Sequence, residues 1–214
     1  MNQRATVQQL QQRIAEMQPL RLDTVGLPTP IELRPLLPGG ALRKGATTSV
    51  HGSVQLALAL ISAVSKDGGW CGAVGLPHLG VEAAATLGIR LDRFVLVGDP
   101  GRHALTVTGM LGEVLSALIV HPTGQVSPGE SERLAAKLRE HGTALIVLGD
   151  WPRSDSSLRV TGARWSGLGQ GHGLLDTHEL TVRSHDRRGG RQHTICFHRG
   201  CLVTSLPRLG EVST

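Results

Sequence analysis

A chain of 214 residues is long enough for one domain with a sizeable buried core and too short for several domains of ordinary size. Its longest apolar runs, such as "SALIV" and "TALIVLG", are far shorter than the roughly 20 residues of a membrane-spanning helix, and the glutamine-rich start is unlike a signal peptide, which predicts a cytoplasmic protein. Three cysteines, Cys71, Cys196 and Cys201, are too few for a disulfide framework and fit a reducing compartment.

Positive charge gathers towards the end of the chain. The formal net charge is +5, and residues 181–214 hold six arginines against Asp186 and Glu211. Such a segment favours contact with nucleic-acid phosphates, although an arginine-rich coding bias gives the same composition. With only three Trp, two Phe and no Tyr, the sequence disfavours a base-stacking platform for single strands.

The first 45 residues are predicted to form a helix and a connector. In "RATVQQLQQRIAEMQ" one apolar stripe lies on an otherwise polar helix that ends before Pro19. The stripe consists of Val7, Leu10, Ile14 and Met17. It suits docking onto a neighbouring molecule in a homo-oligomer, and packing on its own domain is the alternative. Residues 19–45 are rich in proline and glycine and are interpreted as the connector.

From residue 46 onward, apolar strands alternate with helices. Strands are predicted at 47–50, 71–74, 94–97, 117–120 and 144–148, and helices at 55–65, 81–87, 103–115 and after Ser127. The last helix carries explicit signals: Ser127 as N-cap, Pro128 at the first position, Glu130 closing a capping box and Gly142 as the stop. This alternation predicts an α/β domain with a mostly parallel sheet flanked by helices.

After Asp150 the helical pattern stops. Short strands at 158–160, 179–183 and 194–197, joined by the loops "WSGLGQGHG" and "RRGGR", predict an antiparallel extension of the sheet. The resulting organisation is an N-terminal helix and connector over 1–45 and a core domain over 46–214, with the extension and a basic tail at 158–214.

The stretch "VHGSVQLALAL" has the layout of a phosphate-binding loop without the loop itself. A β-branched run leads through Gly52 into an amphipathic helix, as in a mononucleotide site. Only Ser53, Val54 and Gln55 precede the apolar run that starts at Leu56, and the Gly-Lys-Ser/Thr signature is missing. No lysine between Lys44 and Lys66 can replace the missing one.

Several stretches resemble RecA-type cores over roughly residues 36–200, and they follow one another in the order and spacing of such a core. They are "LLPGGALRKG", "QLALALISAVSKDGG", "LGIRLDRFVLV" and "GQGHGLLDTHELTVRSHDRRGG". Within that superfamily the chain is most similar to the ImuA-type proteins, in the actinobacterial form called ImuA-prime. That resemblance rests on "GSVQLALALISAV", "CGAVGLPHLG" and "SPGESERLAAKLREHGTALIVLGDWP".

The resemblance implies a role in the SOS response to DNA damage. ImuA-type proteins are mutasome accessory proteins that work with the polymerase-like adaptor ImuB and an error-prone C-family DNA polymerase, and thereby with the sliding clamp, in translesion synthesis and induced mutagenesis. A cytoplasmic protein that joins the nucleoid after damage is expected. The alternative is a RecA-like SOS cell-division inhibitor that binds the division GTPase.

The positions that carry ATP hydrolysis in RecA hold other residues here. Pro77 and His78 stand where the resemblance places the water-activating glutamate, and His121 ends the strand that should end in the magnesium-binding aspartate. The sequence therefore predicts a pseudo-ATPase without catalytic residues, metal or other cofactor, with a degenerate site near Gly52, Ser53, His78 and His121. Asp150 follows the fifth strand and is not expected to replace that aspartate.

Two groups in the C-terminal region have both a functional and an ordinary interpretation. In "HTICFHRGC", Cys196, His198 and Cys201 hint at zinc, but no fourth ligand has a recognisable spacing, so strand and turn residues are expected. Arg164 in "RWSGLGQGHG" belongs either to a DNA-contacting loop or to a plain surface loop.

The candidates for partner or DNA contact lie in the basic extension. They are Arg164, Arg183, Arg187, Arg188, Arg191, Leu202, Leu206 and Leu209. Exposed leucines bordered by arginines match the composition of a binding surface, and ImuB is the expected partner, with a weak DNA contact as a further option. Closure of the domain's own sheet is the alternative role for the leucines.

Overall fold

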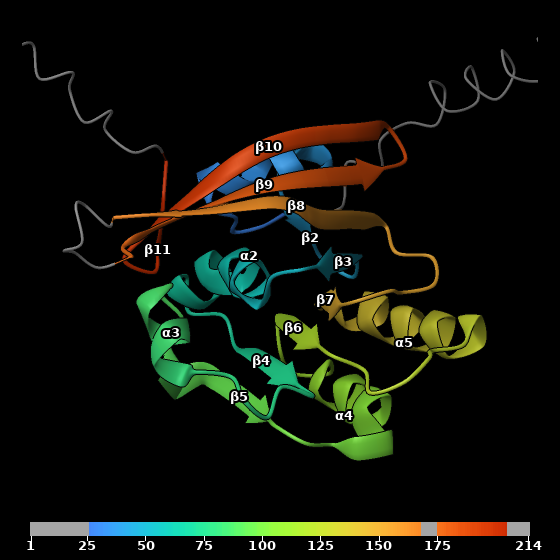
Figure 1. The fold of residues 1–214 in the computed structure, drawn as a ribbon. Coiled ribbons are helices and arrows are strands. Elements are labelled where there is room, and N and C mark those ends of the chain that lie inside the picture. The colour runs from blue at the N-terminus through green and yellow to red at the C-terminus, as the bar shows by residue number, and fades with distance from the viewer. Residues whose placement is uncertain (1–25, 168–174, 205–214) are drawn as a thin grey trace, which may run out of the picture.

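Nine of the described strands form one mixed sheet (Figure 1), and two short strands form a separate pair. The computed structural model describes residues 26–167 and 175–204. The strand order is β11-β10-β9-β8-β3-β7-β6-β4-β5, parallel from β8 to β5 and antiparallel from β8 to β11. The strands are β3 (Thr47–His51), β4 (Cys71–Val74), β5 (Phe94–Val97), β6 (Ala117–Val120), β7 (Ala144–Leu148), β8 (Ser156–Ser166), β9 (Thr177–Asp186), β10 (Gly189–His198) and β11 (Cys201–Val203). The predicted α/β class with an antiparallel C-terminal extension is confirmed.

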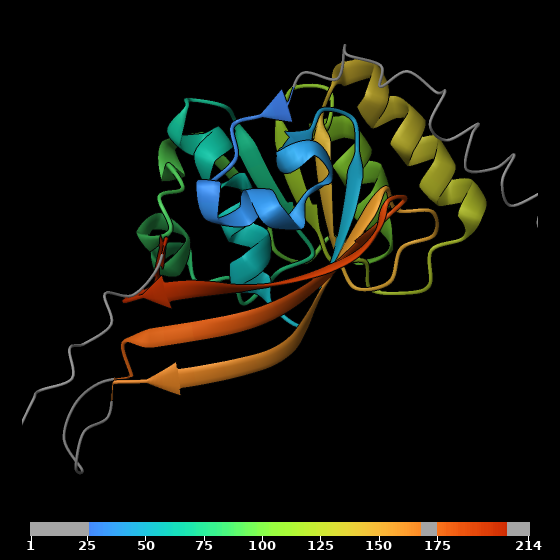
Figure 2. The same cartoon turned by 90° about the horizontal axis from the view of Figure 1, so that it is seen from above.

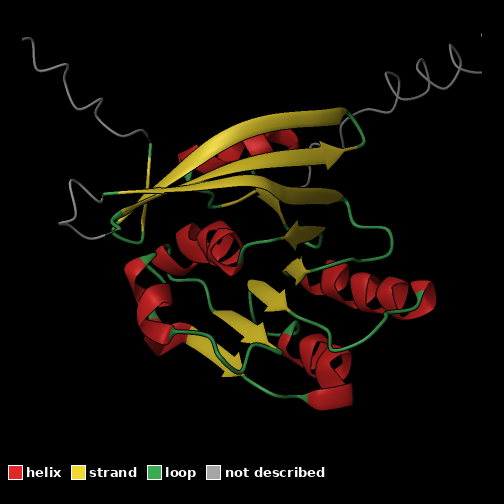
Figure 3. Ribbon diagram, viewed as in Figure 1, coloured by secondary structure: helices red, strands yellow, loops and turns green. Residues whose placement is uncertain are grey.

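Helices cover both faces of the parallel part of the sheet (Figure 3). Helices α2 (Val54–Lys66) and α3 (Val81–Thr86) lie on one face, and α4 (Ala104–Leu111) and α5 (Pro128–His141) lie on the other. Right-handed crossovers dictate this division, because the chain moves one way along the sheet from β3 to β5 and back from β5 to β7. Each face has its own apolar core, one around α2 and one around α4 and α5.

The helix boundaries follow local signals in the sequence. Ser127 caps α5 by accepting a hydrogen bond from the Glu130 amide, the Glu130 carboxylate accepts one from the Ser127 amide, and Gly142 ends the helix in the left-handed conformation. Helix α4 is shorter than predicted and ends before Gly112. At Gly112 a β-carbon would lie 2.1 Å from the Leu138 side chain of α5, so the glycine permits a close approach of the two helices.

Part of the predicted connector contributes to the core. Residues 26–43 form the short strands β1 (Gly26–Leu27) and β2 (Leu42–Arg43) and the 3-10 turns η1 (Ile31–Leu36) and η2 (Pro38–Gly40). Leu33, Leu36 and Leu37 are fully buried in the same core as α2. The proposed division of the chain near residue 45 stays a prediction.

The C-terminal strands are longer than predicted. β8 pairs parallel with β3 and antiparallel with β9, so residues 158–160 belong to the last parallel strand, which the prediction placed in an antiparallel ladder. Trp165 lies in β8, outside the expected loop, and Arg191 lies in β10. Residues 161–166 of β8 and 189–194 of β10 are mostly exposed on both sides of the sheet, so no alternating apolar pattern marks them in the sequence. Seen from above, η1 and α2 lie on one side of this extension, and no helix of the described residues lies on the other (Figure 2).

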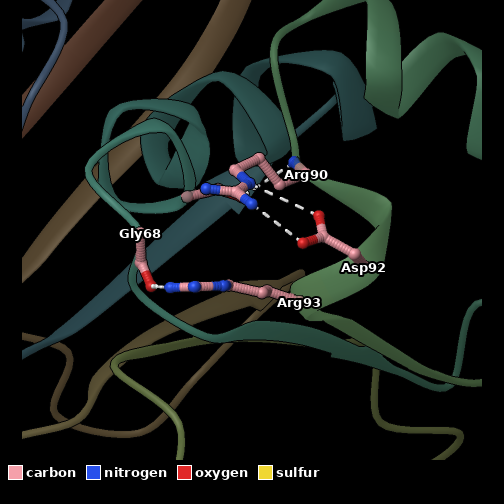
Figure 4. A network of polar contacts seen from close by, with 5 residues as sticks. Gly68, Arg90, Asp92 and Arg93 are labelled. Atoms are coloured by element: carbon pink, nitrogen blue, oxygen red, sulfur yellow. Dashed lines mark hydrogen bonds and ion pairs between the residues drawn. The ribbon is translucent and has the colours of Figure 1, made fainter.

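Polar contacts fix the turn before β5 to the end of α2 (Figure 4). The Arg93 guanidinium donates to the Gly68 carbonyl at 2.6 Å, and the Arg90 amide donates to the Ser65 hydroxyl at 2.9 Å. Arg90 also pairs with Asp92 at 2.9 Å and thereby lowers the pKa of that carboxyl.

Over 26–167 and 175–204, no helix is both long and apolar enough to cross a bilayer.

Candidate functional site

The junction between β3 and α2 is short. Only Gly52 and Ser53 connect the two elements. Ser53 caps the helix by accepting a hydrogen bond from the Leu56 amide at 3.0 Å. A β-carbon on Gly52 would lie 3.3 Å from the Val160 side chain of β8. This two-residue junction is shorter than a phosphate-binding loop, in which several successive backbone amides surround the phosphate.

A cavity of about 720 Å³ opens beside this junction. It is bounded by the start of α2, the loop after β4, helix α3, the residue after β6 and the turn between β10 and β11. His78 and His121 of the predicted degenerate site both line it, together with Val54 and Gln55, the residues that follow Gly52 and Ser53. The structure thus brings the two histidines together at one cavity, where both side chains are exposed.

The position of the cavity follows from the sheet topology. The chain leaves β4 towards α3 on one face and leaves β6 towards α5 on the opposite face. Loops that diverge in this way leave a crevice at the carboxyl ends of the strands, and open α/β sheets bind ligands there. Gly75 permits the close approach of the two strand ends, because a β-carbon there would lie 2.2 Å from the His121 carbonyl oxygen.

A stacked pair of side chains connects α2 with the antiparallel extension. The Nδ1 atom of His178 lies 2.9 Å from Oε1 of Gln55, which lines the cavity. The His178 ring stacks on the Trp165 ring with 3.9 Å between centroids and 7° between planes. Burial lowers the pKa of His178, so the neutral ring is favoured and its Nδ1–H donates to the amide oxygen of Gln55.

Arg199 lies at the rim of the cavity in an unusual backbone conformation. Arg199 (φ 49°) and Gly200 (φ 82°) form the two-residue turn between β10 and β11, and both residues line the cavity. Hairpin turns with two left-handed residues favour Asn-Gly, and a long side chain at the first position is disfavoured. Arg199 carries the one formal charge among the residues that line the cavity, and no Asp or Glu lines it.

The arginines of the extension fall into different environments. Arg183 lies directly opposite Arg159 across the β8–β9 pair, on the exposed side of the strands. Arg164 lies opposite Glu179, and Arg191 is neutralised by Asp186 at 2.7 Å. Arg187 and Arg188 form the exposed β9–β10 turn. No ion pair of the described residues involves Arg159 or Arg183.

The apolar candidates are only partly placed. Leu202 lies in β11 and packs partly buried against the core around α2. This contact agrees with the alternative role given to the leucines in the sequence analysis, in which they pack within the domain's own sheet and do not bind a partner. Several other candidates lie outside the described residues, namely Val7, Leu10, Ile14, Met17, Leu206 and Leu209.

The remaining candidates do not converge on a reactive site. Cys196 is buried, and its burial together with Glu179 raises the pKa of its thiol. Within the described ranges, no three His, Cys, Asp or Glu side chains are placed to share a metal ion. Asp150 is exposed after β7, with Oδ1 3.8 Å from Nδ1 of His51.

Sequence reasoning missed three residues that the structure places prominently. Arg159 was not singled out because its partner Arg183 is 24 positions away, and only the strand register brings the two together. Gln55 lies in the apolar face of α2 near the cavity, and its role depends on the distant His178. Arg199 could have been found from the sequence. In "HRGC" the arginine precedes a glycine, and an arginine is unusual at the first position of the two-residue turn that these residues form.

These features define an α/β protein with a largely apolar crevice at the carboxyl edge of its parallel strands and a two-residue junction at its first β–α unit. The chain belongs to the MT3502 N-terminal domain family, whose model matches residues 35–153. The matched segment includes β3 to β7 and most of the cavity, whereas Arg199 and the antiparallel extension lie outside it.

One curated relative is similar to part of the chain. Over 120 residues the chain is 29% identical to the "Uncharacterized protein Rv3395c" of Mycobacterium tuberculosis. The aligned region covers 54% of this chain and 59% of the relative, so the chain spans about three fifths of the length of the relative it matches.

Proposed function

We propose that the chain is a catalytically inactive RecA-like accessory protein of DNA-damage-induced translesion synthesis. In this role it binds ImuB and supports an error-prone C-family polymerase. The resemblance of the sequence to ImuA-type proteins supplies the biological context. A mostly parallel sheet with its first strand inside the sheet and an antiparallel extension at its end is compatible with that resemblance.

The β3–α2 junction is the observation that carries the non-catalytic part of the proposal. ATP hydrolysis of the RecA type needs backbone amides and a lysine around the phosphates, and carboxylates for water and Mg²⁺. The junction consists of Gly52 and Ser53 alone, and an apolar cavity is lined by His78, in the loop after β4, and by His121, directly after β6. Without the lysine and the carboxylates, these residues favour the binding of a partner over the hydrolysis of ATP.

The partner surface is best supported on the outer side of the antiparallel extension. Like charges directly opposite each other destabilise a strand pair, and Arg159 and Arg183 hold such positions without an ion-pair partner in the described part of the chain. We call these two residues, together with the exposed Arg187 and Arg188 of the β9–β10 turn, the arginine face. An acidic surface of ImuB would relieve this repulsion and give charge complementarity.

A thermal-shift measurement tests the pseudo-ATPase part. A nucleotide that binds the native state raises the melting temperature, and we expect ATP with Mg²⁺ to leave it unchanged. An ATP-dependent shift, or phosphate release that is lost in Asp150→Ala, would overturn this part.

Binding of purified ImuB to charge-reversed chains tests the partner part. We expect the double variant Arg159→Glu/Arg183→Glu to bind ImuB at least about tenfold more weakly, with a weaker dependence on salt than the unchanged chain. Arg102→Glu, an exposed position before α4, is the matched control and keeps full binding. Full-strength binding by the double variant would place the contact elsewhere, and binding of the division GTPase in place of ImuB would favour the cell-division inhibitor.

A further inference from the structure

The cavity between α2, α3 and the β10–β11 turn has no role in the proposed contact with ImuB. Its volume of about 720 Å³ lies within the range of roughly 300–1,000 Å³ that is typical of small-molecule sites. It also lies at the switch point of the parallel sheet, where α/β proteins bind their ligands. Both features indicate a binding site for a small molecule.

The lining defines the body of that molecule. Leu58 comes from α2, and Leu76 and Leu79 come from the loop after β4. Ala83 lies in α3, and Leu87 directly follows that helix. A cavity lined mainly by such apolar side chains binds a ligand of mainly hydrocarbon or aromatic character. The polar groups are few and include the amide of Gln55, which His178 already engages through its oxygen.

The charge of the lining defines the head group. The guanidinium of Arg199 is not opposed by any carboxylate of the lining residues. Arg199 also adopts a left-handed backbone that glycine or asparagine would adopt at lower cost. Backbone strain of this kind is retained where the side chain has a task, and guanidinium groups bind carboxylates and other oxyanions strongly.

We propose that the cavity binds a small amphipathic anion, with its apolar body between α2 and α3 and its single anionic group at Arg199. This site goes beyond the proposed function, because it lies apart from the arginine face and takes a different class of partner. Binding of such an anion requires no chemical step.

Fluorescence titration with 8-anilinonaphthalene-1-sulfonate tests the site, because this probe combines an aromatic body with one anionic group. We expect saturable binding with one probe per chain. Dodecanoate, below its micelle concentration, should displace the probe. Dodecyltrimethylammonium has the same apolar chain and the opposite charge, and it should not displace the probe.

Three variants connect the signal to the cavity. Arg199→Asn keeps the favoured turn and should weaken probe binding about tenfold while the melting temperature stays equal or rises. Ala83→Trp, at an exposed position of α3, should fill the cavity and abolish saturable binding. Arg153→Asn is the matched control, because Arg153 (φ 57°) is also left-handed but lies outside the cavity, and it should bind the probe like the unchanged chain.

The outcomes separate this proposal from the proposed function. Absence of saturable binding, equal displacement by the cationic competitor, or the same loss in Arg199→Asn and Arg153→Asn would each overturn the anion site. None of these results would alter ImuB binding through the arginine face, which is measured separately. Conversely, loss of the ImuB contact in all assays would leave the titration with the probe unchanged.

Discussion

His178 joins the first helix of the parallel core to the antiparallel extension, and its protonation state matters for stability. Burial lowers its pKa below the ordinary value of 6.5 in the folded protein. The unfolded chain therefore binds the proton more readily, and the free energy of unfolding falls as the pH drops below 6.5. His51 acts in the same direction, because burial and the nearby Arg159 lower its pKa despite the opposing effect of Asp150.

We expect the melting temperature to decrease between pH 7.5 and pH 5, and to decrease less in His178→Gln. Glutamine cannot be protonated in this range, so one of the two histidine contributions is removed. Melting curves of both chains at several pH values measure the difference, and His193→Gln, an exposed position in β10, is the control. Parallel pH profiles of the unchanged chain and His178→Gln would contradict this assignment.

The three cysteines differ in reactivity for physical reasons. Burial raises the pKa of Cys71 to about 12, and burial together with Glu179 raises that of Cys196. Cys201 is exposed, with its thiol 3.3 Å from the Thr86 carbonyl oxygen. Since the thiolate is the reactive form, iodoacetamide at pH 8 should modify Cys201 alone in the native protein. Peptide mapping by mass spectrometry would show this, and alkylation of Cys71 without denaturant would contradict the buried position.

At the scale of single elements, α5 shows how far a local signal determines structure. Ser127→Ala removes the side chain that caps the helix and should lower the free energy of unfolding by about 1 kcal/mol, or the melting temperature by about 3 °C. Ser157→Ala in β8 is the matched control, because the Ser157 side chain makes no hydrogen bond to another residue within 26–167 and 175–204. Equal melting temperatures for the two variants would mean that packing, and not the cap, holds the start of α5.

Elements defined by local chemistry were predictable from the sequence, and those defined by distant partners were not. The strands at 71–74, 94–97, 117–120 and 144–148 match β4, β5, β6 and β7 in full, because each is a continuous apolar run bounded by turns. The strands β8 to β10 extend well beyond their predicted ranges. Residues 161–166 of β8 and 189–194 of β10 are mostly exposed on both sides of the sheet, so the local pattern does not mark them as strand. The pairing between neighbouring strands sets their length.

The candidate site shows the same division between local and distant information. The unusual junction at Gly52 and Ser53 and the histidines at 78 and 121 were visible as departures from a known motif. The cavity that both histidines line was not predictable from the sequence. It depends on the loops after β4 and β6, which leave the sheet towards opposite faces, and on the β10–β11 turn near residue 199. Likewise, the pairing of Arg159 with Arg183 requires the strand register.

At the scale of the whole molecule, β11 is the last described strand and still belongs to the fold. It pairs with β10, and Leu202 packs against the core around α2. A chain that ends after Gly200 should therefore lose about 1–2 kcal/mol of stability, the order expected for a partly buried leucine. A chain that ends after Thr204 keeps every described strand and serves as the control in urea denaturation. Equal stability of the two shortened chains would mean that β11 contributes no net packing.

The position of β3 has a consequence for synthesis of the protein. Both neighbours of β3 in the sheet come from residues about 100 positions later, with Thr47 opposite Leu145 and Thr48 opposite Ser156. A nascent chain on the ribosome therefore carries a β-branched strand with two open edges until β7 and β8 have emerged. Pairing across such long separations is slow, and unpaired edges promote aggregation. Because the family match ends at residue 153, before β8, an isolated segment 35–153 would keep one of these edges permanently open.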